Sequence, residues 1–146
     1  MEKGFFSDQP ILFLVTMAAA FVMLKYLPRL TLGVPFLAPG EIKAQMDGNP
    51  DLLIVDVRTE GEFTGKTGHV PGALNLPLSN IRSRLVEIAD DLGPYKAQPV
   101  CVMCRSENRS PKAIKALKKA GFTNLSVMKG GMMAWKREKL PIEGNA

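Results

Sequence analysis

One six-residue stretch combines a thiol, two guanidinium groups and three other polar side chains, and could do nucleophilic chemistry. It follows the apolar run at residues 99–103 and precedes a helical pattern that begins at Ser110, so its cysteine, Cys104, is expected at a turn between a buried strand and a helix. Such a turn directs backbone N–H groups inward, and the start of the helix adds partial positive charge. Because a thiolate is an anion, this position predicts a reactive cysteine.

A core cysteine at a strand end is the alternative interpretation of Cys104, because free cysteines are often buried. Its polar neighbours favour the reactive interpretation. Cys101 lies three residues earlier, and this C-x-x-C spacing is also typical of redox dithiols. An offset of three along a strand places side chains on opposite faces, so a disulfide would require the strand to end early. Two cysteines and one histidine cannot complete a four-ligand zinc site, and no cofactor is indicated.

The elements that must position Cys104 can be predicted from the surrounding pattern. Short apolar runs bounded by turn residues predict strands at residues 36–37, 52–57, 73–76, 100–103 and 125–128. Helical periodicity and capping residues predict helices at residues 39–46, 79–89, 110–120 and 132–139. Strands that alternate with helices indicate the α/β class, with a mainly parallel five-stranded sheet flanked by helices.

Four further motifs accompany the Cys104 stretch. They are Leu-Ile-Val-Asp-Val-Arg at 53–58, Glu-Gly-Glu-Phe at 60–63, Gly-His-Val-Pro-Gly-Ala-Leu-Asn-Leu-Pro at 68–77 and Gly-Gly-Met-Met-Ala-Trp at 130–135. Together, in this order, they resemble the rhodanese-like family of sulfurtransferases over most of residues 36–143. Many family loops that look like this one carry glycine where this chain has Glu107. A carboxylate there opposes a bound anion if it points inward and changes little if it faces solvent.

The resemblance implies a two-step transfer of sulfane sulfur. The thiolate of Cys104 attacks the outer sulfur of a donor anion such as thiosulfate, and a thiol or cyanide then takes that sulfur from the resulting persulfide. Backbone N–H groups of residues 105–109 are expected to hold the charged outer sulfur. The residues expected to bind substrate are Arg105, Ser106, Glu107, Asn108 and Arg109.

The side chains of these residues have alternative roles. Arg105 is expected to face the entrance of the site. Arg109 either attracts the donor or pairs with a carboxylate inside the fold. Ser106 and Asn108 either donate hydrogen bonds to the ligand or stabilise the turn.

Residues of the other motifs are interpreted as structural. Asp56 and Arg58 follow a strand, where a carboxylate usually fixes a nearby loop. His69 lies in a turn motif, which favours packing of the turn over catalysis. Trp135 is expected to anchor the core, with the wall of the pocket as a second role. The lysines of residues 112–119 are interpreted as a solvated helix face, with contact to acidic lipid headgroups as the alternative.

Two other functions remain open for such a fold. Phosphatases and arsenate reductases need room for a tetrahedral oxyanion, and their loops hold five residues between cysteine and arginine. Four residues stand between Cys104 and Arg109, so this loop suits a single sulfur atom better. The other alternative is a non-catalytic rhodanese-like module that docks partners, with Glu107 marking an inactive site. The presence of Cys104 argues against it.

An apolar segment precedes the domain. Residues 11–24 carry no charge, and extension through Leu27 gives roughly 17 residues, near the lower limit for a membrane span. We therefore expect an N-terminal transmembrane anchor with its flanks at residues 1–30, and a rhodanese-like domain with a short linker at residues 31–146. Proline and glycine in residues 28–40 predict a linker that ends the helix after the span.

The flanking charges predict an orientation for this anchor. Lys25 and Arg29 follow the apolar segment, whereas Lys3 and the amino terminus precede it. The positive-inside rule then places the domain on the cytoplasmic side of the cell membrane, in a single-pass protein. A removed signal peptide, which would give an exported soluble protein, is the alternative. The net charge of +5 is modest, and no base-stacking aromatics accompany basic residues, so nucleic acid is not an expected partner.

Overall fold

The computed structural model describes residues 10–144 of the chain, which divides into two compact units, Met1–Gly33 and Val34–Ala146. The first unit contains helix α1 (Pro10–Thr31), which has no buried residue. By length and composition alone, α1 is able to cross a membrane. It continues through Pro28, where the sequence predicted a break. The last turn closes because the Leu32 N–H donates to the Pro28 carbonyl at 3.0 Å, so the proline removes only its own N–H from the ladder.

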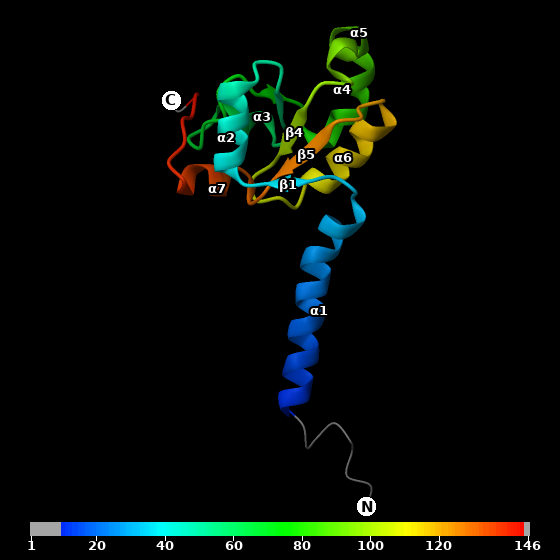
Figure 1. The fold of residues 1–146 in the computed structure, drawn as a ribbon, viewed down its shortest axis with the longest axis vertical. Coiled ribbons are helices and arrows are strands. Elements are labelled where there is room, and N and C mark those ends of the chain that lie inside the picture. Colours follow the sequence, from blue (N-terminus) through cyan, green and yellow to red (C-terminus); the bar gives the residue numbers. More distant parts are fainter. Residues whose placement is uncertain (1–9, 145–146) are drawn as a thin grey trace, which may run out of the picture. The chain divides into compact units, whose positions relative to one another are not determined.

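A five-stranded parallel sheet forms the centre of the second unit (Figure 1). Its strands are β1 (Phe36–Leu37), β2 (Leu53–Asp56), β3 (Leu74–Asn75), β4 (Val100–Met103) and β5 (Leu125–Met128). Their order in the sheet is β1-β5-β4-β2-β3, and each neighbouring pair is parallel. The predicted α/β class and five-stranded sheet are confirmed. The strand that precedes Cys104 is central, and its four residues are all buried.

Helices cover both faces of this sheet (Figure 1). Helices α2 (Pro39–Gly48) and α7 (Gly131–Arg137) pack together on one face. Helices α4 (Ile81–Glu87) and α6 (Ser110–Lys119) pack together on the other. The fold is completed by short helices α3 (Glu60–Thr64) and α5 (Ala89–Leu92) and by two 3₁₀ turns, η1 (Leu78–Asn80) and η2 (Gly93–Tyr95).

The alternation of strand side chains divides the core into two halves. Cys101 and Met103 of β4 belong to a buried cluster with Trp135 of α7 and Ile42 of α2. Val100 and Val102 therefore face the opposite side. This arrangement leaves Cys101 among apolar side chains and places the residue after β4, Cys104, at the carboxyl edge of the sheet. Ligands bind at this edge in open α/β sheets.

The prediction of a single helix at residues 79–89 is wrong in one respect. It is divided into η1, α4 and α5, with a bend at Ile88, whose backbone N–H bonds to the carbonyls of both Arg84 and Val86. Ile88 itself has a φ of −106° and a ψ of 21°, outside the α-helical region, so the regular helical path ends at this residue. Leu85 of α4 and Leu92 of α5 are both buried, on either side of this bend.

Candidate active site

The loop of residues 104–109 connects β4 to α6 and encloses the sulfur of Cys104. The side chain of Cys104 is only 1% exposed. Its Sγ accepts a hydrogen bond from the backbone N–H of Glu107 at 3.0 Å. Glu107 forms this bond with a φ of 128°, a region that side-chain-bearing residues rarely occupy. The backbone is thus held in a strained form that directs a donor at the sulfur, as an anion-stabilising loop must.

The start of α7 forms the second wall of this loop. The N–H groups of Met132 and Met133 donate to the carbonyls of Cys104 and Arg105 at 2.8 and 3.0 Å. A Cβ atom on Gly131 would collide with both of these residues, and Gly131 itself has a φ of 56°. Only glycine permits this approach. The sequence contained the Gly-Gly motif, but its contact with the cysteine loop was not predicted.

The carboxylate of Glu107 adopts neither of the two orientations that the sequence suggested. Its Oε2 accepts a hydrogen bond from the backbone N–H of Gly130 at 2.8 Å, and the side chain is half-buried. Gly130 immediately precedes α7, where backbone N–H groups lack helical partners. Glu107 therefore ties the cysteine loop to α7 through its side chain while its backbone donates to the sulfur.

Arg109 pairs with a carboxylate of the fold. Its two terminal nitrogens donate to the two carboxylate oxygens of Glu62 at 2.7 and 2.8 Å. This bidentate pair lowers the pKa of Glu62 to about 2, first through the hydrogen bond with Arg109, with further bonds from Thr59 acting in the same direction against the effect of burial. The same pair raises the pKa of Arg109. The guanidinium is committed to joining the loop to α3.

The remaining loop residues lie toward solvent. Arg105 and Asn108 are exposed and Ser106 is half-buried. In the part of the chain that the structure describes, no hydrogen bond is formed by the side chain of Ser106 or Asn108. Arg105 lines a hollow of about 530 Å³ beside the loop. Its other lining residues are Arg58, Glu62, Thr67, Met132, Met133 and Lys136.

Ser110 is a residue of interest that the sequence did not single out. It is the first residue of α6, directly after the loop, and is fully buried. Its hydroxyl has no hydrogen-bond partner among residues 10–144. A buried hydroxyl without a partner is costly. The sequence pattern did not indicate an unpaired hydroxyl at Ser110, because serine at a helix start is ordinarily a capping residue.

The two cysteines differ in environment although both are free and 1% exposed. Burial inside β4 raises the pKa of Cys101 to about 12, and a hydrogen bond with Ser126 opposes this only in part. Cys101 is thus a protonated core thiol at neutral pH. Cys104 lies instead in a loop that offers a backbone N–H to its sulfur.

Asp56, Arg58 and His69, which the sequence indicates to be structural, form contacts within the fold. Asp56 accepts from the backbone N–H and the guanidinium of Arg58, which also donates to Thr67 and to the Gly68 carbonyl. His69 stacks on Phe63 at 3.7 Å between ring centroids.

Trp135 is fully buried, and its indole N–H donates to the Pro141 carbonyl. Trp135 is therefore a core anchor, and it is not among the residues lining the hollow beside the loop. Within the described residues, no cluster of three His, Cys, Asp or Glu side chains could hold a metal ion.

Comparisons with known proteins agree with this geometry. The family model for the rhodanese-like domain matches residues 38–138. A protein named sulfurtransferase from Allochromatium vinosum is 38% identical over 92 residues, which cover 63% of this chain and 78% of that protein.

Two solved structures show the same fold. The solution structure of a rhodanese-like domain from Anabaena sp. has a TM-score of 0.64 and 28% identity, covering 75% of this chain and 79% of that one. The thiosulfate sulfurtransferase of Pseudomonas aeruginosa has a TM-score of 0.66 and 26% identity, covering 87% of this chain but 23% of that one. These similarities support sulfurtransferase activity in general. The chain belongs to the rhodanese-like family.

Proposed function

We propose that this protein is a sulfurtransferase that carries sulfane sulfur on Cys104, from a donor such as thiosulfate to a thiol or, in the test tube, to cyanide. The observation that carries this proposal is the 3.0 Å hydrogen bond from the Glu107 backbone N–H to Sγ, inside a loop that Gly131 closes. A donor aimed at the sulfur stabilises negative charge there. The name of the Pseudomonas relative supports thiosulfate as a donor to test first.

The reaction balances without a further reactant. The Cys104 thiolate attacks the outer sulfur of thiosulfate, the sulfur–sulfur bond of the donor breaks, and sulfite leaves with the electron pair. The terminal sulfur of the Cys104 persulfide then carries the negative charge, within reach of the loop N–H groups. An acceptor thiolate attacks this terminal sulfur, and Cys104 leaves as the thiolate.

The hollow beside the loop supports an anionic acceptor. Arg105 and Lys136 both line it, and its carboxylate, Glu62, is already paired with Arg109. Cations at the rim raise the local concentration of anionic ligands. Met132 and Met133 add an apolar, adaptable wall. An anionic thiol that also carries an apolar segment fits these features.

Mass spectrometry of the purified protein mixed with thiosulfate tests the proposal. Loading of one sulfur atom adds about 32 Da by this covalent route. We expect Cys104→Ser to abolish the addition. The matched control Cys101→Ser should load normally, because Cys101 is a protonated core thiol. An intact protein that never gains the mass, with thiosulfate or with a low-molecular-weight persulfide, would favour the non-catalytic docking module instead.

For the N-terminal unit, we propose that α1 is a retained membrane anchor with the domain on the cytoplasmic side. The 22 residues of α1 are long and apolar enough to span a bilayer, and none is buried against other parts of the chain. Arg29 in its last turn adds positive charge at the end that leads to the domain.

A further inference from the structure

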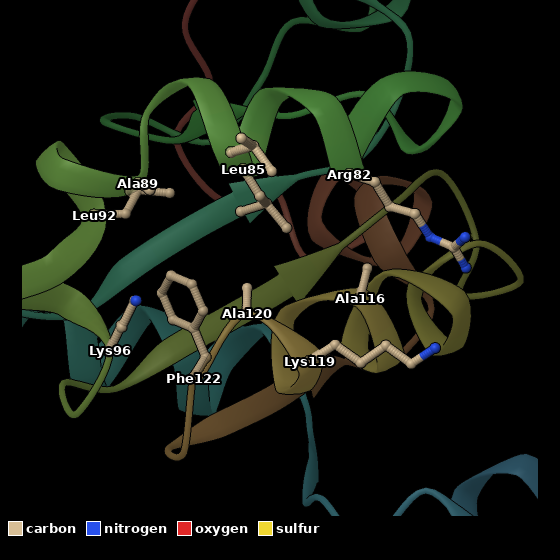
Figure 2. Close-up of a pocket in the computed structure, with 10 residues that line it drawn as sticks. Arg82, Leu85, Ala89, Leu92, Lys96, Ala116, Lys119, Ala120 and Phe122 are labelled. Atoms are coloured by element: carbon tan, nitrogen blue, oxygen red, sulfur yellow. The ribbon is translucent and has the colours of Figure 1, made fainter.

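A second cavity lies on the α4–α6 face of the domain, apart from the cysteine loop. It has a volume of about 430 Å³, within the range of small-molecule sites. Figure 2 shows Leu85, Ala89 and Leu92 facing Phe122 and Ala120 across the cavity. Most of its lining is apolar, and neither Cys104 nor any other residue of the cysteine loop takes part. The proposed sulfur transfer does not use this cavity.

The polar residues of this cavity are all cations. Arg82, Lys96 and Lys119 line it, and no carboxylate does. Over residues 10–144, none of these three groups forms an ion pair. Figure 2 shows Lys96 at one end of the cavity and Arg82 with Lys119 at the other. An apolar cavity with unpaired cations at its ends complements a ligand with an apolar body and an anionic group.

The positive charge is greater at the end formed by Arg82 and Lys119. Arg82 and Lys119 also line a second hollow, of about 860 Å³. Further lysines of α6 line this hollow: Lys112, Lys115 and Lys118. The anionic group of a ligand is therefore favoured at this end. The apolar part then lies between Leu85 and Phe122, where it removes apolar surface from water.

We propose that this cavity binds a free single-chain anionic amphiphile of the fatty-acid class. Its carboxylate lies at Arg82 and Lys119, and its carbon chain lies between Leu85 and Phe122. A flexible chain fits the cavity better than a peptide helix, which is about 10 Å across, so that one turn would fill the space. Ala116 and Lys119, which contact the ligand, belong to the helix that begins directly after the cysteine loop.

A titration of residues 34–146 with dodecanoate, below its micelle concentration, tests the proposal. This unit contains the whole sheet and corresponds to a domain whose relative from Anabaena was solved as a separate domain. In ¹⁵N NMR spectra, we expect saturable shifts at residues 82–92 and 116–122 and none at residues 104–109. Butyrate and the uncharged dodecyl maltoside should bind more weakly.

Two variants and a matched control make the test specific. Lys119→Glu reverses an exposed charge at the head-group end, and should weaken dodecanoate binding by at least about fivefold. Ala89→Trp fills the cavity from its exposed rim and should weaken binding similarly. Lys66→Glu changes the net charge equally but lies outside the cavity, so its affinity should match that of the wild type.

Three results would overturn the proposal. One is the absence of saturable shifts, and another is equal binding of dodecanoate and dodecyl maltoside. The third is an equal loss of affinity in Lys119→Glu and Lys66→Glu, which would show attraction by net charge alone. The fold of each variant is checked by its own spectrum, and none of the three substitutions touches the residues proposed for sulfur transfer.

Discussion

At the scale of the residue, Glu107 has two opposite effects on the site. Its backbone N–H donates to Sγ of Cys104, whereas its carboxylate brings a negative charge into a loop that must hold anions. The bond from Gly130 holds this carboxylate in place and anchors the loop. Glycine would adopt the φ of 128° at position 107 with the least strain. Glutamate keeps this backbone strain, but its carboxylate accepts the hydrogen bond from Gly130 that anchors the loop.

Glu107→Gln separates these two effects, because an amide oxygen can still accept the hydrogen bond from Gly130. Removal of one nearby like charge at an effective dielectric near 20 is worth about 1–2 kcal/mol, so persulfide formation from thiosulfate should accelerate about tenfold. Stopped-flow detection of sulfite release measures the rate. Glu87→Gln, on exposed α4, serves as the control and should leave the rate unchanged. An equal or slower rate in Glu107→Gln would show that the carboxylate does not oppose the donor.

Ser110 allows a second prediction at this scale. Its buried hydroxyl has no partner in the described chain, and an unsatisfied buried polar group costs about 1–3 kcal/mol. Ser110→Ala should therefore raise the free energy of unfolding by about 1 kcal/mol, as measured by urea denaturation. The exposed Ser83→Ala variant, whose hydroxyl bonds only the Asn80 carbonyl within the described residues, controls for helix propensity. A less stable Ser110→Ala would mean that the hydroxyl has a partner after all.

At the scale of the element, Glu62 links α3 to the cysteine loop. The same carboxylate accepts from the Thr59 N–H in a capping box and pairs with Arg109. The pKa of Glu62 is about 2 in the folded protein, against 4.5 for an unperturbed glutamate. The ion pair therefore contributes its full stabilisation above about pH 5. The stabilisation is lost progressively as the pH falls from 4.5 through about 2, where the folded-state carboxylate takes up its proton.

Glu62→Gln should lower the free energy of unfolding at pH 7 by about 1 kcal/mol, after allowance for solvent screening of a carboxylate that is 31% exposed. The amide in this variant can still cap α3, so the lost free energy measures the contribution of the ion pair with Arg109. Urea denaturation at pH 7, 4 and 2 should show the difference from the wild type shrinking toward zero. A difference independent of pH would assign the effect to packing.

The elements differ in how far their sequence determines them. Strands β4 and β5 match their predicted limits, because each is a short, mostly apolar run bounded by turn residues. The bend at Ile88 was missed, since the apolar residues between 81 and 92 are spaced as in one continuous helix and do not mark it. The site behaves similarly. Cys104 follows from a local pattern, but the Glu107–Gly130 and Glu62–Arg109 bonds join residues 23 and 47 positions apart.

At the scale of the whole molecule, the chain joins a domain of a known enzyme family to a helix of a different character. The domain contains its own sheet, core and cysteine loop within residues 34–146. Helix α1 has only exposed or half-buried side chains, most of them apolar. An unburied apolar helix of this length is unfavourable in water, because its apolar side chains remain exposed to solvent. A bilayer, the environment that we propose for this helix, would suit both its length and its composition.

The full chain should therefore sediment with membranes and resist extraction by high salt, because burial of an apolar span is not screened by ions. A variant that begins at residue 34 is the control and should remain in the supernatant. A reporter fused to residue 146 should be active only in the cytoplasm, since Lys25 and Arg29 resist translocation. Activity of the reporter outside the cytoplasm would reject this orientation. A mature N-terminus near Phe21 would instead show that the apolar segment is a removed signal peptide.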